Sequence, residues 1–253
     1  MSKVPAPANG TRTDMRSIVI LLVFVVASAA RAEDPRAAFA RGKALLEQGD
    51  ETAARAAFLE AAEAAPTWLL PYIELGELAV RRREGVAEAR AELRARAESG
   101  ERNPRYHRLL GDLAELDGDD AAAVEAWRRS LGLLSEQVEV RLRMAAALER
   151  LGRHEEAADA YALVLAHDPG DVVVRARHAA ALEAAGRWDE AREQLRTLVR
   201  LQPGQELPLR RLARFHERRG ELQEARRLHE EADRLARRGP PQRRMRPLPP
   251  SKR

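Results

Sequence analysis

The chain has 253 residues, of which 45% are hydrophobic, 4% aromatic and 33% charged. Ala, Leu, Arg and Glu dominate the composition, and because all four favour helices, an all-helical protein is expected. The sequence contains no cysteine, which excludes disulfides, thiolate zinc sites, a catalytic cysteine and a lipidated N-terminal cysteine.

The net charge of +4 is distributed unevenly along the chain. Residues 1–32 hold four basic residues and one acid, and residues 239–253 hold five basic residues and no acid. The intervening residues 33–238 hold 39 acidic and 35 basic residues. Because this central part is mildly acidic, the pI near 9.9 does not indicate nucleic-acid binding, and no nucleic-acid partner is expected.

The first segment of the chain has the pattern of a secretory signal. Lys3, Arg12 and Arg16 precede an unbroken apolar run at 18–26, and the small-x-small sequence at 30–32 fits a cleavage site. We therefore predict an exported, bacterial protein that is periplasmic, held in the cell envelope or secreted.

Two alternatives concern the same signal segment, residues 1–32. The apolar stretch 18–30 is shorter than the roughly 20 residues that a membrane-spanning helix needs, which favours cleavage before Glu33. An uncleaved anchor is the alternative, and it would be the only membrane contact that the sequence predicts. Met15 is a second candidate start, because it would leave a short leader of ordinary length.

From Glu33 onward, a set of landmark residues recurs along the chain. Each repeat has a small residue, which we number zero, then a glycine at +7, alanine at +12, a bulky residue at +16 and, in several repeats, proline at +24. In the fourth repeat these residues are Ala145, Gly152, Ala157, Tyr161 and Pro169. The recurrence predicts one structural unit copied along the chain.

Six repeats follow one another with a period of 34 residues, apart from one inserted residue near Glu84 in the second repeat. The six zero positions are Gly42, Gly76, Gly111, Ala145, Ala179 and Ala213. Apolar residues recur at helical spacing, so each repeat is expected to form two helices. The +7 glycine suits the left-handed residue that ends a first helix. Small residues at zero and +12 would allow the helices to approach closely, with the +16 residue filling the gap toward the next repeat.

This pattern resembles the tetratricopeptide repeat family, whose units are 34-residue helix–turn–helix motifs. The resemblance covers about residues 35–238, and the predicted repeat domain spans residues 33–238, between the signal (1–32) and the tail (239–253). It implies an all-α, right-handed superhelical solenoid of about six units with a concave groove that binds proteins or peptides. A protein or peptide partner is therefore expected, although the resemblance names no particular one.

The resemblance also implies which residues face the ligand: those at −6, −3, +1 and +4 in each first helix. The groove candidates chosen from these offsets are Phe39, Lys43, Leu70, Ile73, Glu77, Arg105, Arg108, Asp112, Leu142, Arg210 and Arg214. The same offsets also select Glu149, Val173, Ala176, Ala180, Glu183 and Leu207.

Three of the five chosen candidates in the first two repeats are apolar, and the candidates in the third and sixth repeats include arginines. Because arginine binds carboxylates through two parallel hydrogen bonds, the hypothesis is an extended peptide with apolar side chains at one end and acidic ones beyond. The alternative is a solvated face of exposed Arg and Glu, whose ion pairs contribute only about 0–1 kcal/mol each.

No catalytic, cofactor or metal site is predicted from the sequence. None of the six histidines forms an i, i+4 pair with another histidine, as a helical zinc motif would. Acidic pairs such as Glu155-Glu156 stand at starts or exposed flanks of expected second helices, where negative charge favours the helix dipole. A non-enzymatic protein without a cofactor is expected.

Residues 239–253 are expected to form a disordered basic tail. The pattern Arg244-x-x-Pro247-x-x-Pro250 fits a polyproline ligand, but such matches are frequent by chance. The favoured interpretation is a basic tether that contacts anionic lipid, peptidoglycan or polymer. The sequence as a whole therefore predicts an exported scaffold that holds other proteins. The alternative is a self-associating subunit or assembly factor of a bacterial cell-envelope complex, and the oligomeric state stays open.

Overall fold

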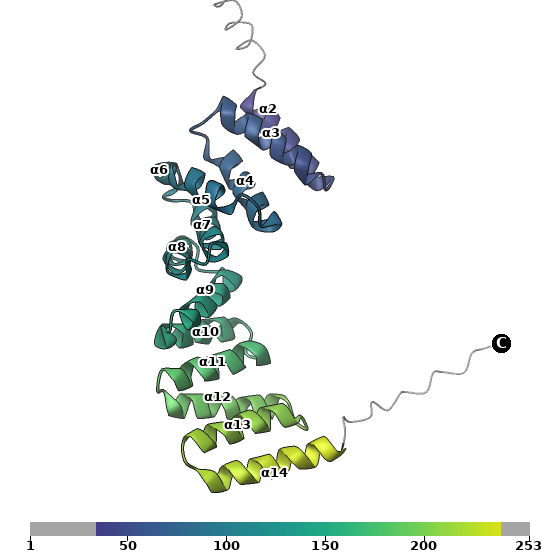
Figure 1. Ribbon diagram of the computed structural model, residues 1–253, viewed down its shortest axis with the longest axis vertical. Coiled ribbons are helices and arrows are strands. Elements are labelled where there is room, and N and C mark those ends of the chain that lie inside the picture. The colour runs from purple at the N-terminus through teal and green to yellow at the C-terminus, as the bar shows by residue number, and fades with distance from the viewer. Residues whose placement is uncertain (1–33, 239–253) are drawn as a thin grey trace, which may run out of the picture. The chain divides into compact units, whose positions relative to one another are not determined.

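The computed structural model describes residues 34–238, which form thirteen α-helices and no strand (Figure 1). The predicted all-helical solenoid is confirmed. The predicted signal at 1–32 and the predicted tail at 239–253 lie outside the described residues. Each repeat contributes two consecutive helices that pack together, as the landmark spacing predicted, and the second repeat adds a short third helix, Ala97–Gly100.

The helices group into two compact bodies, and the division falls between Gly100 and Glu101. The N-terminal body holds the first two repeats. Its helices are α2 (Pro35–Glu47), α3 (Glu51–Ala64), α4 (Leu69–Arg82), α5 (Val86–Arg94) and the short α6 (Ala97–Gly100). A core cluster in this body is formed by the buried residues Ala54, Phe58 and Leu78.

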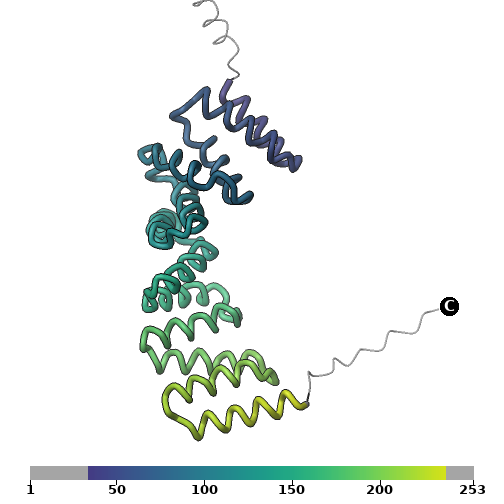
Figure 2. Tube along the Cα trace, viewed as in Figure 1, coloured from purple at the N-terminus to yellow at the C-terminus, as the bar shows by residue number. Residues whose placement is uncertain are grey.

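The C-terminal body holds the remaining four repeats. Its helices are α7 (Pro104–Leu116), α8 (Asp120–Leu133), α9 (Val138–Arg150), α10 (His154–His167), α11 (Val172–Ala184), α12 (Trp188–Leu201), α13 (Glu206–Arg218) and α14 (Leu222–Arg238). Figure 2 traces the reversals of chain direction between successive helices from α9 to α14. One continuous apolar core runs through this body, from Ala114 to Ala232.

The turn inside each repeat depends on a left-handed residue. The +7 glycines of five repeats have φ angles between 71° and 83°, and they are Gly49, Gly118, Gly152, Gly186 and Gly220. In the second repeat the inserted residue Glu84 lies between two left-handed residues, Arg83 (φ 57°) and Gly85 (φ 64°). The inserted residue therefore lengthens the turn, and the second helix of this repeat has 9 residues where the first, third, fourth and fifth repeats have 14.

In two repeats the aromatic ring at +16 packs directly against the backbone at position zero. This close approach explains why glycine occupies position zero in those repeats. A Cβ atom added to Gly111 would lie 2.4 Å from Cδ1 of Trp127, and one added to Gly42 would lie 2.5 Å from Cε1 of Phe58. Both aromatic side chains are fully buried. The +16 residue thus packs across the zero position of its own repeat, a contact that the sequence analysis did not anticipate.

In three repeats, the side chain at −4 contacts the backbone of the segment that joins the repeat to the preceding one. In each case the side chain meets the backbone carbonyl oxygen six residues earlier: His107 Nε2 at 2.9 Å from Glu101, Arg141 Nη2 at 3.1 Å from Ser135, and Arg175 Nη2 at 2.5 Å from Pro169. A carbonyl that has no helical partner is satisfied in this way. These side chains therefore have a structural role.

Candidate partner-binding groove

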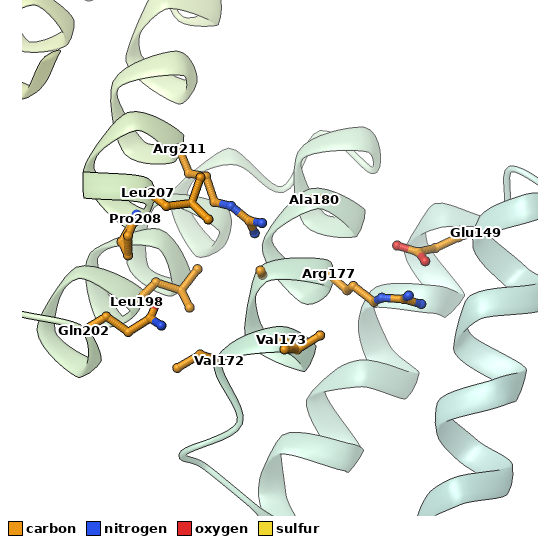
Figure 3. A pocket seen from close by; sticks show the side chains of 11 residues that line it. Glu149, Val172, Val173, Arg177, Ala180, Leu198, Gln202, Leu207, Pro208 and Arg211 are labelled. Carbon is orange, nitrogen blue, oxygen red and sulfur yellow. The ribbon is translucent and has the colours of Figure 1, made fainter. Parts of the chain in front are cut away.

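A groove opens on the C-terminal body between α11 and α13. One part has a volume of about 400 Å³ and is lined from α9, α11, α12 and α13 (Figure 3). A second hollow of about 300 Å³ shares Ala176, Ala180 and Arg211 with the first and extends to Arg214 and Arg218. We refer to the two connected hollows as the basic groove.

The floor of the basic groove is made of small side chains. Ala176 and Ala180 occupy the −3 and +1 offsets of α11, where larger residues would fill the space. At the rim, Val173 is 64% exposed and Leu207 is 56% exposed. Figure 3 shows Val172 and Val173 on α11 near Leu198 of the neighbouring helix. Exposed apolar side chains beside a hollow are suited to burying an apolar side chain of a ligand.

Four arginines supply the positive charge of the groove, with Arg177 on α11 and the other three on α13. Arg177 is hydrogen-bonded to Tyr161, and the Nε of Arg218 donates to Glu183 at 2.9 Å. Arg211 and Arg214, in contrast, make no hydrogen bond or ion pair with any residue between 34 and 238. These two guanidinium groups keep their donors available to a ligand.

The two acidic side chains of the groove are both engaged. Glu183 accepts from Arg218, and Glu149 accepts from the hydroxyl of Tyr161 at 2.7 Å. Burial, together with the hydrogen bond to Glu149, raises the pKa of Tyr161 to about 12, while the nearby Arg177 acts in the opposite direction. Tyr161 therefore remains a donor at neutral pH and holds the Glu149 carboxylate at the groove edge.

The repeat period places equivalent charges at equivalent offsets along the C-terminal body. Arginine recurs at −2 as Arg143, Arg177 and Arg211, and glutamate recurs at +4 as Glu115, Glu149, Glu183 and Glu217. The +1 residue changes from repeat to repeat, in the order Asp112, Ala146, Ala180 and Arg214. The sign of the charge at +1 therefore reverses between the third and sixth repeats.

An acid at +1 neutralises the arginine of the next repeat. Asp112 is buried, with only 4% of the residue exposed. Its carboxylate accepts a hydrogen bond from Nε1 of Trp127 at 2.9 Å and lies 2.9 Å from Nη1 of Arg143. Arg143 also contacts Glu115 at 2.6 Å. Burial raises the pKa of Asp112, while Arg143 and Trp127 act in the opposite direction. Arg143 therefore has a structural role, because its guanidinium group is paired with two acids of the preceding repeat.

Several predicted groove residues face other parts of the structure. Ile73 has no exposed surface and belongs to the core of the N-terminal body. Its assignment to a groove is therefore corrected, because the −3 side chain of α4 points inward. Asp112 is buried in the network just described, so it too is corrected to a structural role. Phe39 is half-buried against Phe58 and Trp68, with ring centroids 5.5 and 4.9 Å away.

The other predicted residues keep some exposure, but most of them lie outside the basic groove. Lys43 donates to Glu74 at 3.3 Å, Arg108 lies 3.9 Å from Asp112, and Arg210 contacts Glu206 and Asp233 at 3.2 and 2.9 Å. The remaining four are half-buried or exposed: Leu70, Glu77, Arg105 and Leu142. Of the candidates first chosen, Arg214 is the one that lines the basic groove.

Three arginines of the groove were missed because they stand outside the four ligand offsets. Arg177 and Arg211 occupy −2, and Arg218 occupies +5. The recurrence of arginine at −2 with a period of 34 residues was a signal that could have identified Arg211. The offsets did select Val173, Ala176, Ala180 and Leu207, all of which line the groove.

Metal binding and membrane insertion find no support in the described part of the chain. Between residues 34 and 238, no group of three or more His, Asp and Glu side chains is arranged to hold a metal ion. In the same range, no helix has both the length and the apolar character that crossing a membrane requires.

Comparisons with solved structures show relatives of the same fold. YrrB, described as a tetratricopeptide protein with an unusual peptide-binding site, has 17% identity and a TM-score of 0.59, over 70% of this chain and 91% of that chain. A MamA protein has 18% identity and a TM-score of 0.58, over 66% of this chain and 91% of that chain. MamA from Desulfovibrio magneticus RS-1 has 19% identity and a TM-score of 0.54, over 68% of this chain and 98% of that chain. No curated protein matches the sequence.

Family models agree with the helix-pair architecture and with the landmark spacing. One model described as a tetratricopeptide repeat matches residues 150–208, and a second with the same description matches residues 25–67 and 121–172. Together the matches cover just over half of the chain. The protein therefore contains tetratricopeptide repeats.

Proposed function

We propose that this protein is an exported scaffold that binds an extended segment of a partner protein in the basic groove between α11 and α13. The observation that carries the proposal is the combination of an alanine-floored hollow with two arginines, Arg211 and Arg214, that have no partner in the described chain. The helices of the C-terminal body position the groove, and the groove supplies the contacts.

The hollow and the arginines support binding more strongly together than separately. A lone exposed arginine is common on protein surfaces, and a lone apolar side chain is equally common. Here Val173 and Leu207 are exposed at the basic groove, which is also lined by Arg211 and Arg214 of α13. Ligand sites combine these features: an apolar hollow and a few polar groups that fix orientation.

The self-association alternative receives less support from the last helix. The residues of α14 that turn inward are Ala225, Leu228 and Ala232, all buried. Its exposed positions include Arg226, Arg227, Glu230 and Arg234. Because the core of a stable homodimer interface is apolar and depleted in charge, the exposed face of α14 does not favour end-to-end association.

Affinity capture with a groove-blocking variant tests the proposal. Ala180 is exposed on the groove floor, so Ala180→Trp should fill the hollow without disturbing the core. The matched control is Ala162→Trp, because Ala162 is exposed on α10 and does not line the groove. We expect full-length wild-type protein and the control to capture the same saturable partner and the groove variant to lose it. Equal capture by all three would contradict the groove.

Export is tested separately by mass spectrometry of the N-terminus of protein purified from its native cells. A mature start at Glu33 is the expected result, because the signal pattern ends at Ala32. If the protein is recovered with membranes and its leader is intact, the proposal of a cleaved, exported scaffold would be replaced by that of a membrane-anchored one.

A further inference from the structure

We infer that the segment recognised by the basic groove is acidic: an apolar side chain enters the alanine-floored hollow beside Val173 and Leu207, and neighbouring carboxylates pair with Arg211 and Arg214. The inference rests on the proposed function and specifies the chemistry of the partner. It assigns recognition to a different place from the sequence hypothesis, which put apolar and basic contacts in separate repeats.

The charge of the groove supports an acidic ligand. Both acids in the groove are offset by arginines, Glu183 by Arg218 and Glu149 by the nearby Arg177. The charge that remains is positive and belongs to Arg211 and Arg214. A guanidinium that pairs with a carboxylate through two hydrogen bonds gains geometric specificity as well as energy.

The spacing of the two arginines supports more than one carboxylate in the ligand. Arg211 and Arg214 are three residues apart on α13, so their side chains project from the same face of the helix. Arg211 borders both hollows, whereas Arg214 borders only the second. A bound segment with its apolar residue in the first hollow would therefore place successive acidic residues along α13.

The tail of the same chain is a poor occupant of the groove. Residues 239–253 carry five basic residues and no acid. Like charges repel, so this tail would add to the positive charge that Arg211 and Arg214 already present. Charge complementarity therefore favours a separate acidic partner.

Selection from a displayed library of random twelve-residue peptides tests the inference on the full-length chain. Four proteins are compared: wild type, Arg211→Gln/Arg214→Gln, Ala180→Trp and the control Arg226→Gln/Arg227→Gln. The control removes the same charge from exposed positions of α14 that do not line the groove.

We expect wild type and control to enrich peptides with two or more acidic residues near a large apolar one. Arg211→Gln/Arg214→Gln should bind the best such peptide about tenfold or more weakly at low salt, and the difference should shrink as salt is raised. Ala180→Trp should enrich none of these peptides.

Other outcomes separate the two proposals. Enrichment of neutral or basic peptides that Ala180→Trp abolishes would overturn the acidic assignment and leave the binding role intact. Enrichment that survives Ala180→Trp, or no enrichment at all, would overturn both. Binding of single-stranded polyuridylate with the same dependence on Arg211 and Arg214 would reassign the groove to nucleic acid.

Discussion

Two pairs of repeats in the C-terminal body can be compared offset by offset: the third with the fourth, and the fifth with the sixth. Residues at equivalent offsets have different roles in the two pairs. Around α7 and α9, Arg143 lies against the buried acid Asp112 and against Glu115. Around α11 and α13, the equivalent arginine is Arg211, and the residue equivalent to Asp112 is Ala180. The acid that remains nearby, Glu183, is paired with Arg218.

This comparison shows how a repeat protein separates stability from recognition. The period fixes where an arginine side chain stands, and its local surroundings decide whether it is neutralised. Asp112 at +1 of the third repeat pairs with Arg143, which completes a buried network. At the same offset of the fifth repeat, Ala180 leaves a hollow open, and Arg211 keeps its donors for a ligand.

The largest effect is expected for Trp127→Ala, which acts on the buried network of the third repeat. The substitution removes a fully buried side chain and the donor that Asp112 accepts from. We expect the free energy of unfolding of the C-terminal body to fall by about 3–5 kcal/mol. Urea denaturation followed by circular dichroism measures it, and a loss below about 1 kcal/mol would contradict the packing described for this repeat.

Gly111→Ala tests the close approach of the same tryptophan. The new Cβ would lie 2.4 Å from Trp127, so the ring must shift, at a cost of about 1–3 kcal/mol. The control is Gly132→Ala on α8, where a Cβ meets nothing within 4 Å and helix propensity should increase stability by roughly 0.5–1 kcal/mol. Thermal melts that move both variants in the same direction would refute the distinction.

Arg143→Gln and Arg211→Gln compare the two faces directly. Removing Arg143 leaves the buried carboxylate of Asp112 without its cation, which should cost about 1–3 kcal/mol. Removing Arg211 breaks no hydrogen bond or ion pair within the described residues and should change stability by no more than about 0.5 kcal/mol. Urea midpoints give both values, and equal losses would mean that the two arginines have the same role.

The cost of Arg143→Gln should depend on pH. Burial already raises the pKa of Asp112 above 3.8, and Arg143 is the strongest of the groups that lower it. Without Arg143 the folded-state pKa rises further, so the variant binds a proton more readily when folded than when unfolded. Its destabilisation should therefore be largest near pH 7 and should diminish as pH falls toward about 4. If the loss of stability does not depend on pH, the cause would be lost packing and not the lost pairing with Asp112.

The smallest change in stability is expected for Ala180→Asp, which gives the fifth repeat the acid of the third. Ala180 is exposed, so the substitution should alter stability by no more than about 0.5 kcal/mol. It should nevertheless weaken binding of acidic peptides, because the new carboxylate competes for Arg211. Ala180→Asn is the matched control without charge, and equal affinity of the two variants for an acidic peptide, measured by fluorescence anisotropy, would refute electrostatic recognition.

The sequence predicted the helix pairs because packing at zero, +7, +12 and +16 repeats with the backbone. It predicted the groove residues poorly because burial differs among repeats at the same offset. Ile73 and Ala176 both stand at −3, yet Ile73 is in a core and Ala176 lines a hollow. Neutralisation is also non-local: Arg143 pairs with Glu115, 28 residues away. Such pairings become visible only when equivalent offsets are compared between neighbouring repeats.

The most direct test of the binding site is photo-crosslinking from position 180 of the full-length protein in its native cells. A photoreactive phenylalanine analogue replaces Ala180, and the same analogue at the exposed position Ala162 on α10 serves as the control. We predict one saturable adduct from position 180, formed with an acidic segment of a partner protein and lost on Arg211→Gln/Arg214→Gln. Equal adducts from both positions, or an adduct that is indifferent to those two arginines, would contradict recognition in the basic groove.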